Sequence, residues 1–167
     1  MQTTKDYIRK LLLETAQKAF FEKGFKSVSM REISKLSGIG LSNIYNYFSC
    51  KDDIFVQIVT PAVRTFENML DEHHGRRGTD IMAMCDRDYF KYMVDEYTSF
   101  IHRHRDLLQL LLFRSQGSSL ENYKEEFARK STALVKEYFT LMKHKHPKLE
   151  TDISDFSIRM HTVWMFA

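Results

Sequence analysis

The chain has 167 residues, of which 43% are hydrophobic and 28% are charged, and its net charge is +3. These values are ordinary for a globular protein and argue against disorder. Only two prolines and six glycines interrupt it, which favours an all-α protein. The first residues lack the apolar core of a signal peptide, and the longest apolar run, residues 107–113, is too short to span a bilayer. Cys50 and Cys85 have no metal-type or disulfide-type spacing, so we expect two free thiols in a cytoplasmic protein without a membrane partner.

Positive charge is concentrated in the first third of the chain. Residues 1–50 carry eight Lys or Arg and four Asp or Glu, a net charge of +4, and the remainder is close to neutral. A basic N-terminal segment followed by a nearly neutral remainder is typical of a protein that begins with a small nucleic-acid-binding domain. A merely solvated helix face would show the same charge, so charge alone does not decide between the two.

The first two helices carry clear end signals. Apolar residues at helical spacing predict a helix from about residue 4 to Lys23, which Gly24 ends. Ser29 and Glu32 then form a capping box, and Val28 and Ile33 form a hydrophobic staple. This second helix is expected to end near Leu36.

The stretch EISKLSGIGLSNIYNYF, residues 32–48, predicts a second short helix directly after a glycine-containing turn. Ile44 and Phe48 are four residues apart and face inward together, which leaves the polar residues between them on the outer arc. Two short helices joined by a tight turn make a helix-turn-helix. The outward residues are Ser42, Asn43, Tyr45, Asn46 and Tyr47.

The rest of the chain predicts a helical bundle. A fourth helix begins at residues 49–51, and Pro61 should bend or break it. The remaining expectations are a loop over 73–79, a helix with an apolar stripe over 90–101, a short helix over 105–113, a helix beginning at Ser118 or Ser119 and ending at 144–147, and a last helix from Thr151 or Asp152. The expected domains are 1–50 for DNA binding and 51–167 for ligand binding and dimerisation.

Residues 8–54 resemble the TetR family of transcriptional regulators. The resemblance is carried by AFFEKGFKSVSMREIS, LSGIG, IYNYF and KDDI, which follow the family pattern without a gap. It implies a homodimeric regulator, a repressor, whose two heads bind a near-palindromic double-stranded DNA operator. It also implies an apolar or aromatic small molecule that enters the C-terminal core and releases the DNA.

The resemblance also assigns roles to individual residues in the head. Phosphate contacts fall on Ser29, Tyr45, Tyr47 and Lys51, with Arg31 close by, and base contacts fall on Leu41, Ser42, Asn43 and Asn46. The chemistry agrees, because Asn can pair bidentately with adenine and a Tyr hydroxyl can donate to a phosphate. Leu41 replaces a common Lys, and Ser49 and Cys50 replace a common Lys-Ser pair, so fewer cations should mean weaker binding and a shallower salt slope.

A ligand pocket in the bundle is expected from the same resemblance. Met and aromatic side chains on several helices would line it, since adaptable Met and Tyr hydroxyls suit an apolar or aromatic ligand. The candidates are Met69, Met93, Tyr97, Phe100, Phe127, Tyr138 and Trp164.

No catalytic, metal or cofactor site is expected. The histidine pairs at 73–74, 102/104 and 144/146 do not have metal-ligand spacing on a helix, and solvated or loop histidines are the simpler interpretation. No nucleophile motif or glycine-rich phosphate loop is present. Two alternatives stay open: an enzyme with a helical N-terminus, and a helical protein-interaction module without sequence-specific DNA binding.

The end of the chain is rich in apolar residues, Ile158, Met160 and Val163 to Ala167, and carries no helix-closing Gly, Asn or Pro. We expect from this that the natural chain is longer. We also expect the last helix, around Trp164, to lie at or beside a dimer interface, because so apolar a turn would otherwise be exposed.

Overall fold

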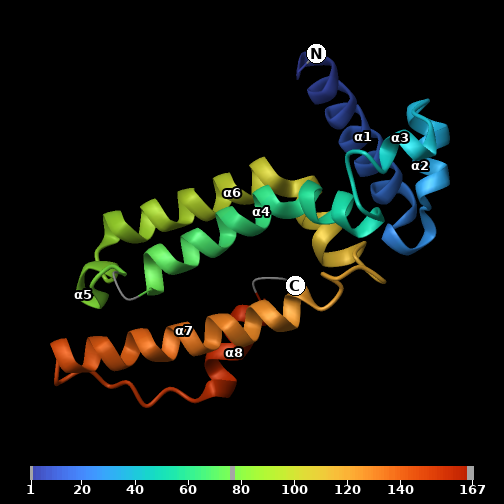
Figure 1. Ribbon diagram of the computed structural model, residues 1–167. Helices are drawn as coiled ribbons and strands as arrows, with labels where there is room; N and C mark the ends of the chain where they lie inside the picture. Colours follow the sequence, from blue (N-terminus) through green and yellow to red (C-terminus); the bar gives the residue numbers. More distant parts are fainter. Residues whose placement is uncertain (1, 76–77, 165–167) are drawn as a thin grey trace. The chain divides into compact units, whose positions relative to one another are not determined.

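The computed structural model describes residues 2–75 and 78–164, with side chains described for residues 4–75 and 78–160. Every regular element in these ranges is a helix, which confirms the all-α prediction (Figure 1). The elements in chain order are α1 Gln2–Lys23, the 3-10 turn η1 Phe25–Ser27, α2 Met30–Ser37, α3 Leu41–Ile44, α4 Lys51–His74, α5 Ile81–Met84, α6 Arg87–Phe113, α7 Tyr123–Lys145 and α8 Asp155–Trp164.

The chain divides into two compact units, and neither is one continuous stretch. The head unit comprises the chain up to Ala62 together with His104–Glu121, and the body unit comprises Val63–Arg103 and the chain from Asn122 onward. This division differs from the expected boundary near residue 50. The reason is that the first turns of α4 bury Ile54 and Phe55 completely, in the core of the head unit.

Three aromatic rings form the centre of the head unit. Phe20, Phe25 and Phe55 lie with ring centroids 5.1 to 5.6 Å apart, mostly edge to face. The backbone N–H of Phe25 donates to the carbonyl of Arg114 at 2.9 Å, so the later segment is hydrogen-bonded into the head. A second such link joins the Ser119 N–H to the Asp52 carboxylate at 2.8 Å. Burial of large aromatic groups of this kind gives most of the stability of a small unit.

The turn between α2 and α3 is held by two serines. Gly38 ends α2 in the left-handed conformation, with φ of 70°. The Ser34 hydroxyl donates to the carbonyl of Ile39 at 2.7 Å, and the Ile39 N–H donates to the Ser37 hydroxyl at 3.2 Å. These bonds satisfy polar groups that a helix end leaves unpaired. The orientation of α3 against α2 is therefore fixed by local hydrogen bonds.

Helix α4 differs from the sequence-based expectation, and α6 agrees with it. Pro61 does not break α4, which continues to His74, because the stripe of buried side chains, including Ala62 and Phe66, runs on past it. Proline costs such a helix one backbone donor. The two helices expected over 90–101 and 105–113 are both present within α6, where a kink with non-helical angles at His104 separates them. The short α5 was not anticipated.

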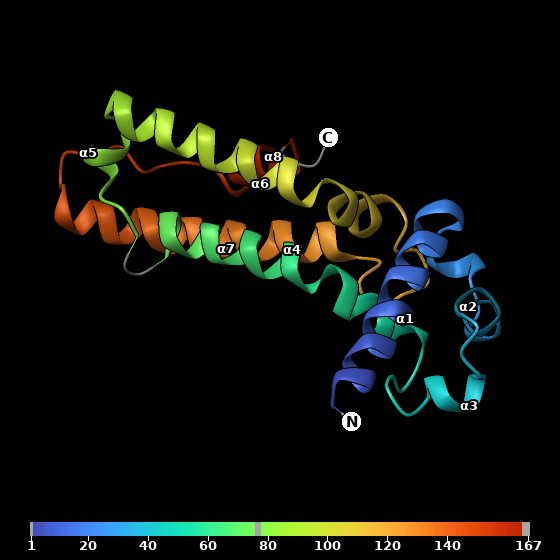
Figure 2. The ribbon, with the colours of Figure 1, turned by 90° about the horizontal axis from the view of Figure 1, so that it is seen from above.

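The body unit is built around stacked rings. Phe66 of α4 stacks on Phe127 of α7, with centroids 4.4 Å apart and planes at 11°, and on Phe100 of α6, with centroids 5.3 Å apart. Figure 2 shows the second half of α4 running alongside α7. The body unit thus brings α4, α6 and α7 together through one aromatic side chain.

Candidate DNA-reading head and body cavity

The helix-turn-helix presents polar side chains on an apolar base, as predicted. Ile44 and Phe48 are 0% and 1% exposed and hold the segment down. Ser42, Tyr45 and Asn46 are exposed, and Tyr45 keeps 51% of its surface. Leu41, Asn43 and Tyr47 are half-buried at the edges of the same surface. The backbone after Ile44 continues as a turn, with the Tyr47 N–H donating to the Ile44 carbonyl at 2.9 Å.

The two asparagines expected to read bases are hydrogen-bonded to each other. The side-chain amide of Asn46 donates to the side-chain oxygen of Asn43 at 3.2 Å. The Asn43 side chain keeps both of its amide hydrogens for another acceptor, and Asn46 keeps its oxygen. The pair therefore presents donor and acceptor groups in a fixed relation, which is what recognition of a base edge requires.

Ser29 begins α2 as the sequence predicts. Its hydroxyl accepts from the Glu32 backbone N–H at 3.1 Å. The Lys23 ammonium, 2.5 Å from the Glu32 carboxylate, and more weakly the Ser29 backbone amide lower the pKa of Glu32. Lys23 is thus paired within the head, whereas Arg31 remains exposed.

Lys51 has a structural role that the sequence did not reveal. Its ammonium donates to the backbone carbonyls of Phe25 and Val28, each at 2.7 Å, and lies 4.0 Å from the centroid of the Phe25 ring. Burial lowers the pKa of Lys51. The expected phosphate contact of Lys51 stays a prediction, and in this structure the ammonium is turned inward to close the η1 turn.

Comparison with known proteins identifies this head. Residues 12–58 match the sequence profile of the family described as bacterial regulatory proteins, tetR family. Over this N-terminal segment, the chain is similar to regulators of the TetR family. The match covers α2, α3 and the residues that flank them.

Curated HTH-type transcriptional regulators are similar to this chain over different lengths. The uncharacterized HTH-type regulator YhgD of Bacillus subtilis is 34% identical over 64 residues, which are 38% of this chain and 34% of the relative. An uncharacterized HTH-type transcriptional regulator of Haemophilus influenzae is 25% identical over 145 residues, which are 85% of this chain and 66% of the relative. The matched part of this chain thus covers about one third of the length of the first relative and about two thirds of the length of the second.

Solved structures of transcriptional regulators share the fold. SCO3833, a TetR family member from Streptomyces coelicolor, has a TM-score of 0.62 and 24% identity, with 93% of this chain and 72% of that chain covered. NalD, the secondary repressor of a multidrug efflux pump in Pseudomonas aeruginosa, has a TM-score of 0.62 and 16% identity, with 98% and 84% covered. FadR of Bacillus subtilis, solved with stearoyl-CoA, has a TM-score of 0.59 and 14% identity, with 94% and 82% covered.

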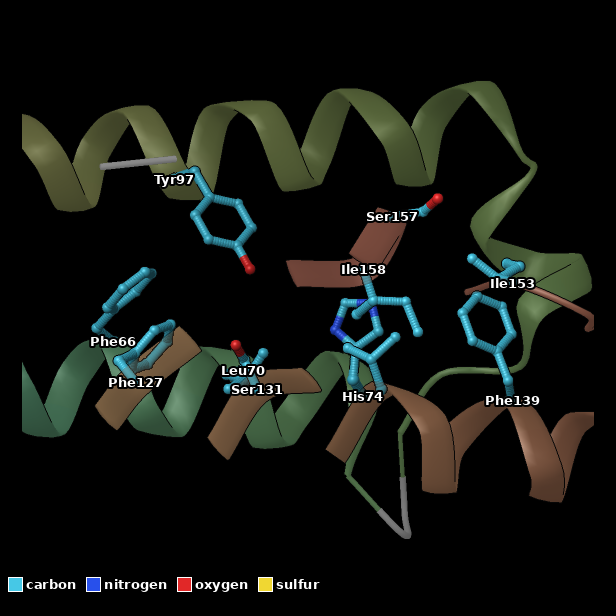
Figure 3. Close-up of a pocket in the computed structure, with 11 residues that line it drawn as sticks. Phe66, Leu70, His74, Tyr97, Phe127, Ser131, Phe139, Ile153, Ser157 and Ile158 are labelled. Atoms are coloured by element: carbon cyan, nitrogen blue, oxygen red, sulfur yellow. The ribbon is translucent and has the colours of Figure 1, made fainter. Parts of the chain in front are cut away.

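The body unit contains a cavity of about 380 Å³ (Figure 3). This volume lies within the usual range of small-molecule sites. The walls are mostly aromatic and aliphatic, and none of the lining residues that the structure describes is an Asp, Glu, Lys or Arg. They come from α4, α6, α7, α8 and the segment before α8: Phe66, Leu70, His74, Tyr97, Phe127, Ser131, Val135, Phe139, Ile153, Ser157 and Ile158.

Of the predicted pocket residues whose side chains are described, Tyr97 and Phe127 line this cavity and the other four do not. Met69 is buried one position before Leu70 and therefore points about 100° away from it around α4. Phe100 stacks against Phe66. The Tyr138 hydroxyl donates to the Thr79 carbonyl at 2.7 Å. Met93, half-buried on α6, is also absent from the lining, and the Trp164 side chain lies outside the described residues.

Two histidines expected to be solvated or in a loop lie in the last turn of α4, where His73 is buried and His74 is half-buried. His73 is 3% exposed, with its ring nitrogens 2.7 Å from the Tyr89 hydroxyl and 2.7 Å from the Glu96 carboxylate. His74 lines the cavity, and burial, with His73 beside it, lowers its pKa to about 4. A sequence signal did exist for His74, because it follows Phe66 and Leu70 at intervals of four residues.

His146 is engaged as well. Its Nε2 lies 2.9 Å from the carboxylate of Asp80, the residue that caps α5, and Lys145 contacts the same carboxylate. Within the described ranges, no cluster of three or more His, Cys, Asp or Glu is arranged to hold a metal ion. None of the helices in those ranges has the length and apolarity needed to cross a membrane.

Proposed function

We propose that this chain is a DNA-binding transcriptional regulator, a repressor, that reads its operator with the segment from Leu41 to Tyr47. The observation that carries the proposal is the exposed Ser42, Tyr45 and Asn46 above the buried Ile44 and Phe48, inside the segment that matches the TetR profile. A recognition helix of this kind presents its first residues to the major groove. We assign no catalytic activity to it.

The proposed operator is near-palindromic, and the proposed regulator is a homodimer acting in the cytoplasm. A two-fold dimer places two identical heads on half-sites about one helical turn apart, about 34–36 Å. Support comes from the family assignment of the head.

The proposed signal is a small molecule in the body cavity. The support is a mostly apolar cavity of about 380 Å³ with few polar groups, which is the usual form of a small-molecule site. Occupation of the cavity by an apolar or aromatic effector then lowers the affinity of the heads for the operator.

The test is selection of bound fragments from random double-stranded DNA by the purified full chain. We expect enrichment of one near-palindromic sequence. An unselected population would favour the helical protein-interaction module, for which the exposed Phe90, Tyr92 and Val94 on α6 are the relevant surface.

The selected operator then allows a sharper prediction about the head. Tyr45→Phe removes one hydroxyl at a proposed phosphate contact and should weaken binding to every operator variant by about three- to tenfold, equivalent to about 0.5–1.5 kcal/mol. Tyr92→Phe, the same change on the body unit at a side chain of similar exposure (53%), is the control and should leave affinity unchanged.

Asn43→Ala makes the complementary measurement. It should relax the preference at one base pair in each half-site, costing roughly 1–3 kcal/mol against the wrong base. An equal loss of affinity for all single-base operator variants would show that Asn43 contacts the DNA backbone and does not read a base.

A further inference from the structure

The body cavity contains an unusual polar group for so apolar a site. The Nδ1 atom of His74 is buried and has no hydrogen-bond partner within the described part of the chain. An unpaired buried nitrogen costs roughly 1–3 kcal/mol, so a ligand that pairs with it recovers that cost. Figure 3 shows the imidazole of His74 among the apolar side chains that line the cavity.

The other polar side chains of the lining differ in how they are used. The Ser131 hydroxyl donates to the Ala128 carbonyl at 3.1 Å, and the Ser157 hydroxyl lies 3.0 Å from that of Ser154. Tyr97 has no hydrogen bond to any described residue, and Figure 3 shows its hydroxyl directed toward the other lining side chains. Two groups, His74 and Tyr97, are therefore available to a ligand from α4 and α6.

Among the described residues, the cavity lining offers no counter-ion to a charged ligand. None of the lining side chains in that part of the chain is a carboxylate, an ammonium or a guanidinium. Burial keeps His74 neutral, with a pKa of about 4, and raises the pKa of Tyr97 to about 12. A buried ion without a partner is strongly disfavoured, so this lining selects against charge.

Shape adds a further restriction. The rings of Phe66 and Phe127 are stacked at 4.4 Å, and Tyr97 and Phe139 contribute two more aromatic rings to the wall. The volume of about 380 Å³ equals that of about a dozen liquid water molecules at about 30 Å³ each. A compact ligand with one or two aromatic rings fits this space.

We propose that the cavity binds a neutral aromatic ligand that carries a hydroxyl group, and that this hydroxyl pairs with Nδ1 of His74. A hydroxyl both donates and accepts, so it satisfies either tautomer of the imidazole and accepts from the Tyr97 hydroxyl as well. This inference rests on the proposed effector role of the cavity and names the chemical class of the effector.

The test uses four probes of nearly equal size, measured by titration calorimetry on the full chain at pH 7.5. They are 2-naphthol, 2-methylnaphthalene, 2-naphthoate and 2-naphthylmethylammonium. We expect 2-naphthol to bind about tenfold more tightly than 2-methylnaphthalene, the effect of one hydrogen bond. We expect the two ions to bind at least a hundredfold more weakly than 2-naphthol.

Variants identify the atom responsible. His74→Leu should remove the advantage of 2-naphthol over 2-methylnaphthalene while leaving binding of the latter within about threefold. Tyr97→Phe removes only a hydroxyl and serves as the variant least able to disturb the fold, and it should reduce 2-naphthol affinity by a smaller factor. Cooperative thermal unfolding of each variant establishes that the body unit is intact.

Three results would overturn the proposal. One is the absence of 2-naphthol binding, another is an equal affinity for the hydroxyl and methyl probes, and the third is tighter binding of 2-naphthoate. A carboxylate held by a protonated His74 would take up a proton, so its binding enthalpy would change with the ionisation enthalpy of the buffer. If 2-naphthol binds through His74 and operator affinity does not change, the ligand class stands and the effector role of the cavity fails.

Discussion

At the scale of single residues, the chain contains two titratable side chains whose surroundings change their ordinary behaviour. His74 lies in an apolar cavity at the end of α4, and Lys51 lies against two backbone carbonyls at its beginning. The Nδ1 atom of His74 has no hydrogen-bond partner among the described residues, whereas the Lys51 ammonium donates to the carbonyls of Phe25 and Val28. Both effects predict changes in stability that can be measured without DNA or ligand.

His74 should make folding sensitive to acid. Its pKa of about 4 is below the ordinary value of 6.5, so the unfolded chain binds a proton more readily than the folded chain. The free energy of unfolding should therefore be highest above pH 6.5 and fall as the pH drops toward 4, by up to about 3 kcal/mol. Urea unfolding at pH 7.5 and pH 5, compared between the wild type and His74→Leu, measures it. The variant should lose clearly less stability, and parallel losses would assign the acid sensitivity to other groups.

Lys51 should stabilise the head unit. Lys51→Met keeps the aliphatic part of the side chain but removes both hydrogen bonds to the Phe25 and Val28 carbonyls, so it should cost about 1–3 kcal/mol. Lys35→Met at an exposed site is the control and should change stability by less than about 0.5 kcal/mol. The comparison is made by urea unfolding at neutral pH. A small effect at Lys51 combined with a salt slope of operator binding lower by about one would instead indicate a phosphate contact.

At the scale of elements, the turn between α2 and α3 depends on the conformation of one glycine. Gly38 has φ of 70°, whereas Gly40, two residues later, has φ of −55° and ψ of 140°, which any residue adopts. A Cβ would meet nothing within 4 Å at either position. The two glycines therefore differ in backbone conformation and not in available space.

Gly38→Ala should cost about 1–2 kcal/mol, because an alanine in the left-handed region brings its Cβ against the following carbonyl. Gly40→Ala should be neutral or stabilising by up to about 1 kcal/mol, since it reduces the freedom of the unfolded chain. Thermal unfolding of the two variants in parallel measures the difference. Equal effects would show that the turn adapts to the left-handed penalty.

Elements with local end signals were predicted well from sequence, and contacts between distant residues were not. Ser29, Glu32 and Gly38 begin or end α2 through atoms within a few residues, so α2 is found near its expected position. Likewise, the four-residue spacing of Ile44 and Phe48 identifies the buried side of the turn segment.

The partners of Lys51 are 23 and 26 residues away, and the partners of His73 on α6 are 16 and 23 residues away. No pattern of nearby residues indicates such pairs. Met69, Met93, Phe100 and Tyr138 do not line the described cavity for the same reason, because several helices have a buried stripe and the sequence does not show which parts of the stripes face one another.

At the scale of the whole molecule, the head unit is assembled from two separate stretches of chain. The segment His104–Glu121 buries Leu110 and Leu111 at 0% and 2% exposure and bonds to the backbone of Phe25 through Arg114. The part of the chain that matches the TetR profile is thus not sufficient to complete the unit.

A fragment of residues 1–62 should therefore fail to unfold cooperatively. Within the full chain, Leu110→Ala should destabilise the head by about 2–5 kcal/mol through the cavity it leaves. Circular dichroism during thermal unfolding tests the fragment, and joining residues 104–121 to it through a flexible glycine-serine linker should restore a cooperative transition. A fragment of 1–62 that unfolds cooperatively by itself would show that the second stretch is dispensable.

The second stretch also limits how regulators of this type can be recombined. Exchange of DNA specificity between two relatives is usually imagined as a single crossover after the recognition helix. In this chain, such a crossover would take Phe25 and Asp52 from one relative and Arg114 and Ser119 from the other. These residues are hydrogen-bonded to one another across the two stretches. A hybrid with a folded head would require a second crossover pair around residues 104–121, so the head unit of this chain is encoded in two pieces.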